Sequence, residues 1–269
     1  MLYGNASKGA IFATTLVMPT IASLMTSLRL YARLGVSKNA GRDDAFIIAA
    51  VLFSWATTIT MIAQAEEGMG LHQWTLSPHT AKLTLRAFWA MIIVYNLSLL
   101  CTKLSILCQY LRIFPQKSVR TATYVVIGIV SCYGIWRLFS AIFTCNPPAA
   151  FWDHSIKQKK CQDRLALSLA STILNMTTDL MIALLPLPYI NNLQLPRRQR
   201  YALVAVFALA GAVVIVSILR LPSLYHLMES KDTTWENPMA VIWSTIEINV
   251  AIICSCLPTL RCLFPRLLR

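Results

Sequence analysis

The stretch that decides the fold is residues 86–111, RAFWAMIIVYNLSLLCTKLSILCQYL, in which Lys103 is the one charged side chain after Arg86. A helix rises about 1.5 Å per residue, so about 20 consecutive apolar residues cross the hydrocarbon core of a bilayer. Within that core the backbone must satisfy its own hydrogen bonds, and a single helix does so. The stretch is therefore predicted to be a transmembrane helix.

Six further segments have a similar length and composition. The seven segments cover residues 10–31, 44–65, 86–111, 121–144, 165–190, 201–225 and 238–260. Hydrophobic residues make up 57% of the chain and charged residues 13%, and the mean hydropathy is +0.59. A soluble domain has about a quarter of its residues charged. We predict an all-α, polytopic membrane bundle of seven transmembrane helices, in which residues 1–269 form a single domain.

The basic residues indicate how this bundle is oriented. One set of alternate loops, with the C-terminal segment, holds Arg29, Arg33, Lys38, Arg42, Arg112, Lys117, Arg120, Arg197, Arg198, Arg200, Arg261, Arg266 and Arg269. Only Asp43 and Asp44 oppose them, whereas acidic and basic residues nearly balance in the other loops. The positive-inside rule then places the N-terminus outside and the C-terminus in the cytosol.

The net charge of +13 thus reports topology, and we expect no nucleic-acid partner. Membrane lipid and a lipophilic small molecule are the expected partners. The sequence does not define an oligomeric state.

Two features agree with this orientation. Cys145 and Cys161 flank the loop after the fourth predicted helix, on the side predicted to be oxidising. A disulfide there closes a loop of about 15 residues and contributes up to about 3 kcal/mol in the loop-entropy model. Asn5 begins the sequon Asn5-Ala6-Ser7, also on the outer side. We therefore predict a disulfide between the two cysteines and glycosylation at Asn5.

Five ionisable residues fall at membrane depth: Lys103, Arg137, Asp179, Arg220 and Glu247. Each costs at least about 2.5–3.5 kcal/mol at the centre of a helix, so each is expected to face the bundle interior and find a partner. The simplest arrangement places Asp179 near Lys103, and Glu247 near Arg137 or Arg220.

Helical spacing adds polar neighbours to these charges. Ser171, Asn175 and Asp179 recur every four residues and share one helix face. Asn96 lies seven residues before Lys103, and Trp243 lies four before Glu247. The pattern predicts a polar cavity that opens toward the outside.

Two interpretations of this cavity stay open. The charges can be structural pairs that fix how the helices pack. Alternatively, the cavity binds a small molecule and supplies a general acid and base. In the second case the predicted catalytic residues are Asp179, Glu247, Arg220 and Lys103. The predicted substrate-binding residues are Asn96, Arg137, Asn175, Trp243 and His72, the last in an outer loop that can cover the cavity.

Missing motifs narrow the chemistry. The last predicted helix contains no lysine, which excludes a retinal Schiff base of the usual kind. The chain has no Gly-rich phosphate loop and no His/Cys cluster at metal-ligand spacing. We therefore expect no metal and no other cofactor.

Several stretches together resemble a known family. They are Arg29-Leu30-Tyr31-Ala32-Arg33 with Gly41-Arg42-Asp43-Asp44, residues 102–114, Cys145-Asn146-Pro147 with Trp152-Asp153 and Cys161, and the positions Asn175, Asp179, Pro186, Arg220, Trp243, Glu247 and Pro258. In this combination the chain resembles the fungal rhodopsin-like integral membrane proteins. That resemblance implies seven helices and a link to Pth-type receptor-like proteins or to members encoded in satratoxin and other specialised-metabolite clusters.

Two functions follow as expectations. In the first, the protein acts in specialised-metabolite biosynthesis, as a cyclase or isomerase using acid–base or electrostatic chemistry, or in an accessory role. In the second, it is a chemosensory receptor for an extracellular small molecule. Short predicted cytosolic loops, and only residues 261–269 after the last predicted helix, favour the first. Either function places a multi-pass protein in the endoplasmic reticulum or plasma membrane.

Overall fold

Seven α-helices form the described part of the chain, which in this computed structural model comprises residues 8–36, 41–114, 116–153, 156, 160–185, 211–225 and 233–260. The helices are α1 (Lys8–Leu30), α2 (Arg42–Glu66), α3 (Pro78–Ile113), α4 (Lys117–Ile142), α5 (Arg164–Leu184), the helix Gly211–Tyr225 and α8 (Thr233–Leu260). A π-helical segment, Tyr31–Val36, continues α1. Five of the described α-helices are long and apolar enough to span a membrane, and these are α2, α3, α4, α5 and α8.

Local capping sets where several helices begin. α3 starts at Pro78 rather than at residue 86, because the Ser77 hydroxyl accepts a hydrogen bond from the Thr80 N–H at 3.2 Å and proline suits the first helical turn. The Asp163 carboxylate caps α5 by accepting from the Leu165 N–H at 3.0 Å. Residues 186–190 and 201–210, which belong to two predicted spans, lie outside the described residues, as does Asn5.

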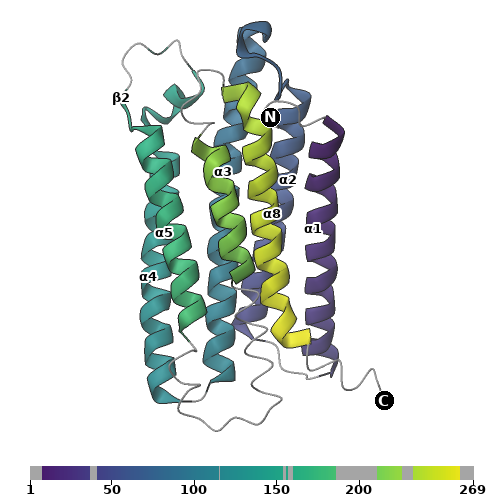
Figure 1. Ribbon diagram of the computed structural model, residues 1–269, viewed down its shortest axis with the longest axis vertical. Coiled ribbons are helices and arrows are strands. Elements are labelled where there is room, and N and C mark those ends of the chain that lie inside the picture. The colour runs from purple at the N-terminus through teal and green to yellow at the C-terminus, as the bar shows by residue number, and fades with distance from the viewer. Residues whose placement is uncertain are drawn as a thin grey trace.

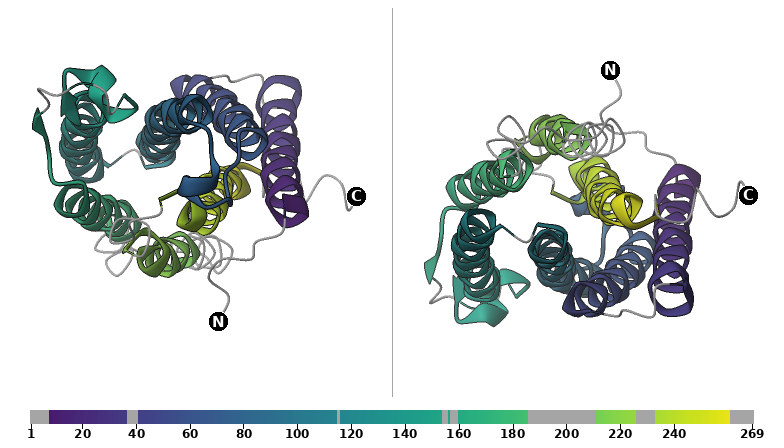
Figure 2. Two further views of the ribbon diagram at one scale, coloured as in Figure 1. Left: turned by 90° about the horizontal axis from the view of Figure 1, so that it is seen from above. Right: turned by 90° about the horizontal axis from the view of Figure 1, so that it is seen from below.

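Seen from either end, the helices follow one another around the bundle in chain order, and α8 closes it against α1 (Figure 2). One core cluster joins α1, α2, α3 and α8 through residues such as Ile47, Leu99 and Ile252. A second joins α3, α4 and α5. Gly134 of α4 allows this packing, because a Cβ there would lie 2.6 Å from Leu100 Cδ1 of α3.

The outer faces carry exposed apolar side chains, including Leu52, Ile59, Phe139, Ile173 and Ile215. Of the five spanning helices, α8 is the most buried and α4 the least. A bundle with an apolar exterior and several polar groups inside is the arrangement that a bilayer favours.

One end of the bundle holds a small disulfide-linked hairpin (Figure 1). The strands β1 (Cys145–Asn146) and β2 (Lys160–Cys161) pair antiparallel, and Cys145 is bonded to Cys161, which confirms the predicted disulfide. We call this the hairpin end, and α1, α3, α5 and α8 all begin there. The side of the membrane on which it lies remains the prediction made from the loop charges.

The loop between α2 and α3 also lies at the hairpin end. Gly68 and Gly70 adopt positive φ angles of 102° and 88°, a conformation that glycine takes without strain. The Gly70 N–H donates to the Thr234 carbonyl at 2.9 Å, so this loop is tied to the first turn of α8.

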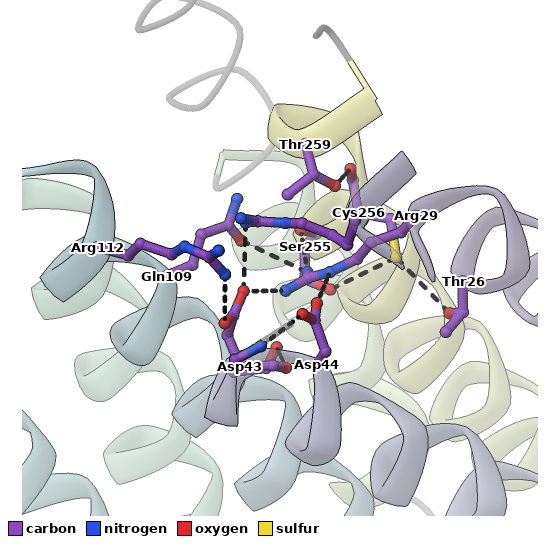
Figure 3. Close-up of polar contacts among 12 residues, drawn as sticks. Thr26, Arg29, Asp43, Asp44, Gln109, Arg112, Ser255, Cys256 and Thr259 are labelled. Carbon is purple, nitrogen blue, oxygen red and sulfur yellow. Dashed lines mark hydrogen bonds and ion pairs between the residues drawn. The ribbon is translucent and has the colours of Figure 1, made fainter. Parts of the chain in front are cut away.

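The opposite end is held by Arg29, which is fully buried (Figure 3). Its guanidinium lies 2.9 Å from Asp43 and 3.3 Å from Asp44, both on the first turn of α2. It also donates to the Ser255 carbonyl of α8 at 2.9 Å and contacts the Gln109 side chain of α3. One side chain of α1 therefore joins α2, α3 and α8.

Two more cations complete this Arg29 cluster. Arg33 and Arg112 lie 3.3 and 3.4 Å from the Asp43 carboxylate, and the Ser105 hydroxyl donates to the Asp43 carbonyl at 2.7 Å. The sequence placed these charges in loops as topology signals. The structure instead buries Arg29, Asp43 and Asp44 between helices, because Arg29 lies in the last turn of α1 and the two aspartates lie in the first turn of α2, where these side chains meet α3 and α8.

Replacing Arg29 with Gln is expected to lower the free energy of unfolding by about 3–5 kcal/mol, because it leaves Asp44 buried without its cation. Unfolding in detergent by denaturant measures the change. The control is Arg42→Gln, which removes the same charge from an exposed position at the same end. Equal stability of the two variants would contradict the proposed role of Arg29.

Candidate functional site

The centre of the bundle contains a buried ion pair between Arg220 and Glu247. Arg220 comes from the helix Gly211–Tyr225 and Glu247 from α8, and their side chains approach to 2.7 Å. The Tyr95 hydroxyl of α3 donates to Glu247 and accepts from Arg220. The Arg220 guanidinium also lies over the Tyr95 ring, 5.1 Å from its centroid. Three helices thus meet at one charge pair.

The second carboxylate oxygen of Glu247 is also occupied. It accepts from the Ser217 hydroxyl at 2.7 Å and from the Asn175 amide at 3.3 Å. Because Glu247 is fully buried, these donors and Arg220 replace the water that a carboxylate would otherwise bind.

A second ion pair lies beside the first. Lys103 of α3 is 3.1 Å from Asp179 of α5. The Lys103 ammonium also donates to the Asn175 side chain at 2.8 Å, to the Asn175 carbonyl at 2.9 Å and to the Thr178 hydroxyl at 2.6 Å. Asn175 bonds to both groups, so the two pairs form one polar layer across the bundle. The predicted pairing of Asp179 with Lys103 is confirmed. Of the two cations predicted near Glu247, Arg137 and Arg220, the structure pairs it with Arg220.

A main cavity of about 270 Å³ lies between this layer and the hairpin end. Its walls are mostly apolar and include Phe88, Met91, Ile92, Leu167 and Leu224. Polar side chains of thirteen lining residues interrupt this mostly apolar surface. Those are Thr84, Tyr95, Asn96, Tyr133, Arg137, Thr144, Ser168, Ser171, Thr172, Asn175, Arg220, Asn237 and Ser244. Apolar walls with a few polar groups are typical of small-molecule sites.

A second cavity of about 60 Å³ lies on the other side of the polar layer. Lys103, Asp179 and Glu247 line it, together with Gln109 and Ser255. The latter two also contact Arg29. The polar layer therefore separates the main cavity from a smaller space that reaches the Arg29 cluster.

The structure divides the predicted site residues between these spaces. Asn96, Arg137, Asn175 and Arg220 line the main cavity. Of the four predicted catalytic residues, only Arg220 does so. Trp243 is half-buried and is not among the described residues that line either cavity.

His72 lies in the loop between α2 and α3, with its ring stacked between those of Trp74 and Trp235. The ring centroids are 4.3 and 4.1 Å apart, and both interplanar angles are 9°. The stack packs this loop onto the first turn of α8, at the hairpin end. Its predicted function in covering the cavity stays a prediction.

Several polar residues of this site were not predicted, among them Ser217, Tyr95 and Asn237. Ser217 precedes Arg220 by three positions and shares its helix face, which is a signal that the sequence contained. Tyr95 gave none, because a single tyrosine in an apolar helix is ordinary. Asn237 lies before the predicted start of its helix, yet it lines the main cavity and donates to Gln64 at 2.9 Å.

Among the described residues, no group of three or more His, Cys, Asp or Glu side chains is arranged to hold a metal ion. The arrangement can instead position a small molecule by electrostatic and apolar contacts. The fold and site define the class of protein, a seven-helix integral membrane protein with a polar layer inside the bundle. Residues 28–266 match the family model described as the fungal rhodopsin domain, and the chain therefore belongs to that family.

Similar proteins come from several fungi. The chain is 27% identical to "Polyenoic acids biosynthesis gene cluster protein Ba17b" of Metarhizium anisopliae, over 93% of this chain and 72% of that protein. It is 28% identical to "Satratoxin biosynthesis SC1 cluster protein 4" of Stachybotrys chartarum, over 65% of this chain and 63% of that protein. It is 23% identical to "Receptor GIN3" of Arthrobotrys oligospora, over 66% of this chain and 43% of that protein. No solved structure matches.

Replacing Lys103 with Met is expected to cost about 3–5 kcal/mol of unfolding free energy, because Asp179, whose side chain is only 13% exposed, is left without its cation. Chemical denaturation in detergent measures it. The matched control is Lys117→Met, at an exposed position on α4. If both variants unfold at the same denaturant concentration, the Lys103–Asp179 pair does not support the bundle.

Proposed function

We propose that this protein binds a lipophilic small molecule in the main cavity and acts in specialised-metabolite biosynthesis. The observation that carries the proposal is the cavity itself, about 270 Å³ of mostly apolar space with Arg137, Arg220, Asn96 and Asn175 in its wall. Similarity to proteins whose names refer to biosynthesis clusters supports the pathway assignment.

The geometry favours electrostatic over acid–base chemistry in a cyclase or isomerase. Asp179 and Glu247 are each bonded to a cation and line the second cavity, away from a ligand in the main cavity. Arg220 and Arg137 line the main cavity and can stabilise negative charge that develops on a substrate. An accessory role, in which the cavity binds and presents a pathway intermediate, uses the same residues.

A receptor is the second candidate, and a specific observation favours it. Arg220 lines the main cavity, and its partner Glu247 lines the second cavity, whose wall reaches Gln109 and Ser255 beside Arg29. A ligand that binds one arrangement of this polar layer better than another increases the population of that arrangement. The conformation of the opposite end of the bundle, at Arg29, can change with it. Similarity to a protein named as a receptor agrees with this candidate.

We also propose that the partners of this protein are membrane lipid and the lipophilic ligand, and that nucleic acid is not a partner. The compartment is the endoplasmic reticulum or the plasma membrane, with Asn5 glycosylated on the outer side.

Filling the cavity tests the proposed function. In the source organism, Ser168→Phe inserts a ring into the main cavity, whereas Ile173→Phe enlarges an exposed side chain on the same helix. We expect the extract of the Ser168→Phe strain, analysed by liquid chromatography and mass spectrometry, to lose the same metabolite as a gene deletion. The Ile173→Phe strain should retain it.

Immunoblots of membranes must show equal amounts of both variant proteins. A deletion strain with an unchanged metabolite profile would overturn the biosynthetic proposal. If that strain also fails to respond to an external small molecule, the receptor is supported instead.

A further inference from the structure

Arg137 is a cation in the wall of the main cavity without an anionic partner among the described residues. It lies on α4 and is half-buried. The other titratable side chains in the wall of that cavity are Tyr95, Tyr133 and Arg220, and none of these is a carboxylate. An arginine in a low-dielectric setting is costly unless a negative group or several acceptors surround it.

The charges of the described membrane-depth residues do not balance. Lys103, Arg137 and Arg220 are cations, and Asp179 and Glu247 are anions. Each carboxylate already has its own cation, Asp179 with Lys103 and Glu247 with Arg220. The positive charge of Arg137 is therefore the one that the polar layer leaves uncompensated.

Two polar atoms in the cavity wall have no hydrogen-bond partner among the residues that the structure describes. The Nε of Arg220 is a buried donor without an acceptor, and Oδ1 of Asn237 is a buried acceptor without a donor. Both residues are at least nine-tenths buried, with 5% and 4% of their surfaces exposed. Buried polar groups are nearly always hydrogen-bonded, so such atoms in a cavity wall indicate groups that a ligand can supply.

We infer that the main cavity binds a lipophilic monocarboxylic acid whose ionised carboxylate pairs with Arg137 and whose apolar body contacts Phe88, Met91 and Leu167. The inference rests on the proposed function and names its ligand class. Arginine suits this task because its planar guanidinium binds carboxylates through two parallel hydrogen bonds. The carboxylate supplies the charge that neutralises the interior, and it is also an acceptor for Arg220 Nε.

The experiment compares dodecanoic acid with methyl dodecanoate, which has a similar apolar body but no charge. The protein is reconstituted in phosphatidylcholine nanodiscs at about pH 8, where the acid is ionised. Ligand-dependent thermal stabilisation gives an apparent affinity for each probe. We expect the acid to bind at least about tenfold more tightly than the ester, as one charge-assisted hydrogen-bond pair predicts.

Variants of the protein test whether Arg137 causes the preference for the acid over the ester. Arg137→Gln should bind acid and ester equally, and Arg137→Lys should retain part of the preference for the acid. Arg86→Gln removes a positive charge from an exposed position on α3 and should keep the full preference. If Arg137→Gln does not fold, the preference of Arg137→Lys for the acid is compared with that of the wild-type protein. A smaller preference in Arg137→Lys supports the inference, and an equal preference contradicts it.

The outcomes separate the inference from the proposed function. Equal affinities of the wild-type protein for acid and ester would overturn the carboxylate inference while leaving the small-molecule cavity intact. Binding of neither probe would count against the cavity function itself as well as the inference. A repeat with phosphatidylglycerol nanodiscs identifies the source of the anion. If that lipid alone stabilises the protein through Arg137 and abolishes the effect of the acid, the occupant is a lipid headgroup and the free-acid inference is wrong.

Discussion

The ion pair between Arg220 and Glu247 is the constraint on which the interior of this bundle depends. Neither charge can lie at membrane depth alone, because the hydrocarbon offers it no water and no counter-ion. Their contact joins the helix Gly211–Tyr225 to α8, and Tyr95 adds α3. Through Asn175, α5 and its Asp179–Lys103 pair are joined to the same layer. The polar layer therefore determines how these four helices can rotate and pack.

This layer also explains the division of space inside the bundle. The disulfide hairpin lies at one end of the bundle, and the Arg29 cluster joins the helices at the other (Figures 1 and 3). The polar layer lies between them. The main cavity occupies the part toward the hairpin, with mostly apolar walls and with Arg137, which has no anionic partner in the described part of the chain. A guanidinium in this wall is the group that the inferred acid-binding site requires.

Hydropathy predicted the bundle and the pairing of its buried charges, because both follow from the cost of polar groups in lipid. Hydropathy could not decide whether Glu247 pairs with Arg137 or Arg220. These helices are apolar on all sides, so their sequences give little information about how each helix is rotated about its axis. The start of α3 was missed because Ser77 and Pro78 cap a helix that extends beyond the apolar segment. Arg29 was counted as a loop charge because it lies near the end of its predicted segment, although three helices surround it. Tyr95 had no signal, because its role arises from two residues distant in sequence.

In the polar layer and the main cavity each carboxylate has its own cation, and a ligand is proposed to supply the negative charge for Arg137. The most direct measurement is an electron cryo-microscopy structure of the protein in nanodiscs with dodecanoic acid, using an antibody fragment to aid alignment. The account predicts density in the main cavity with its carboxyl end within hydrogen-bonding distance of the Arg137 guanidinium. An acid bound on the lipid-facing surface, with Arg137 paired to another protein carboxylate, would contradict it.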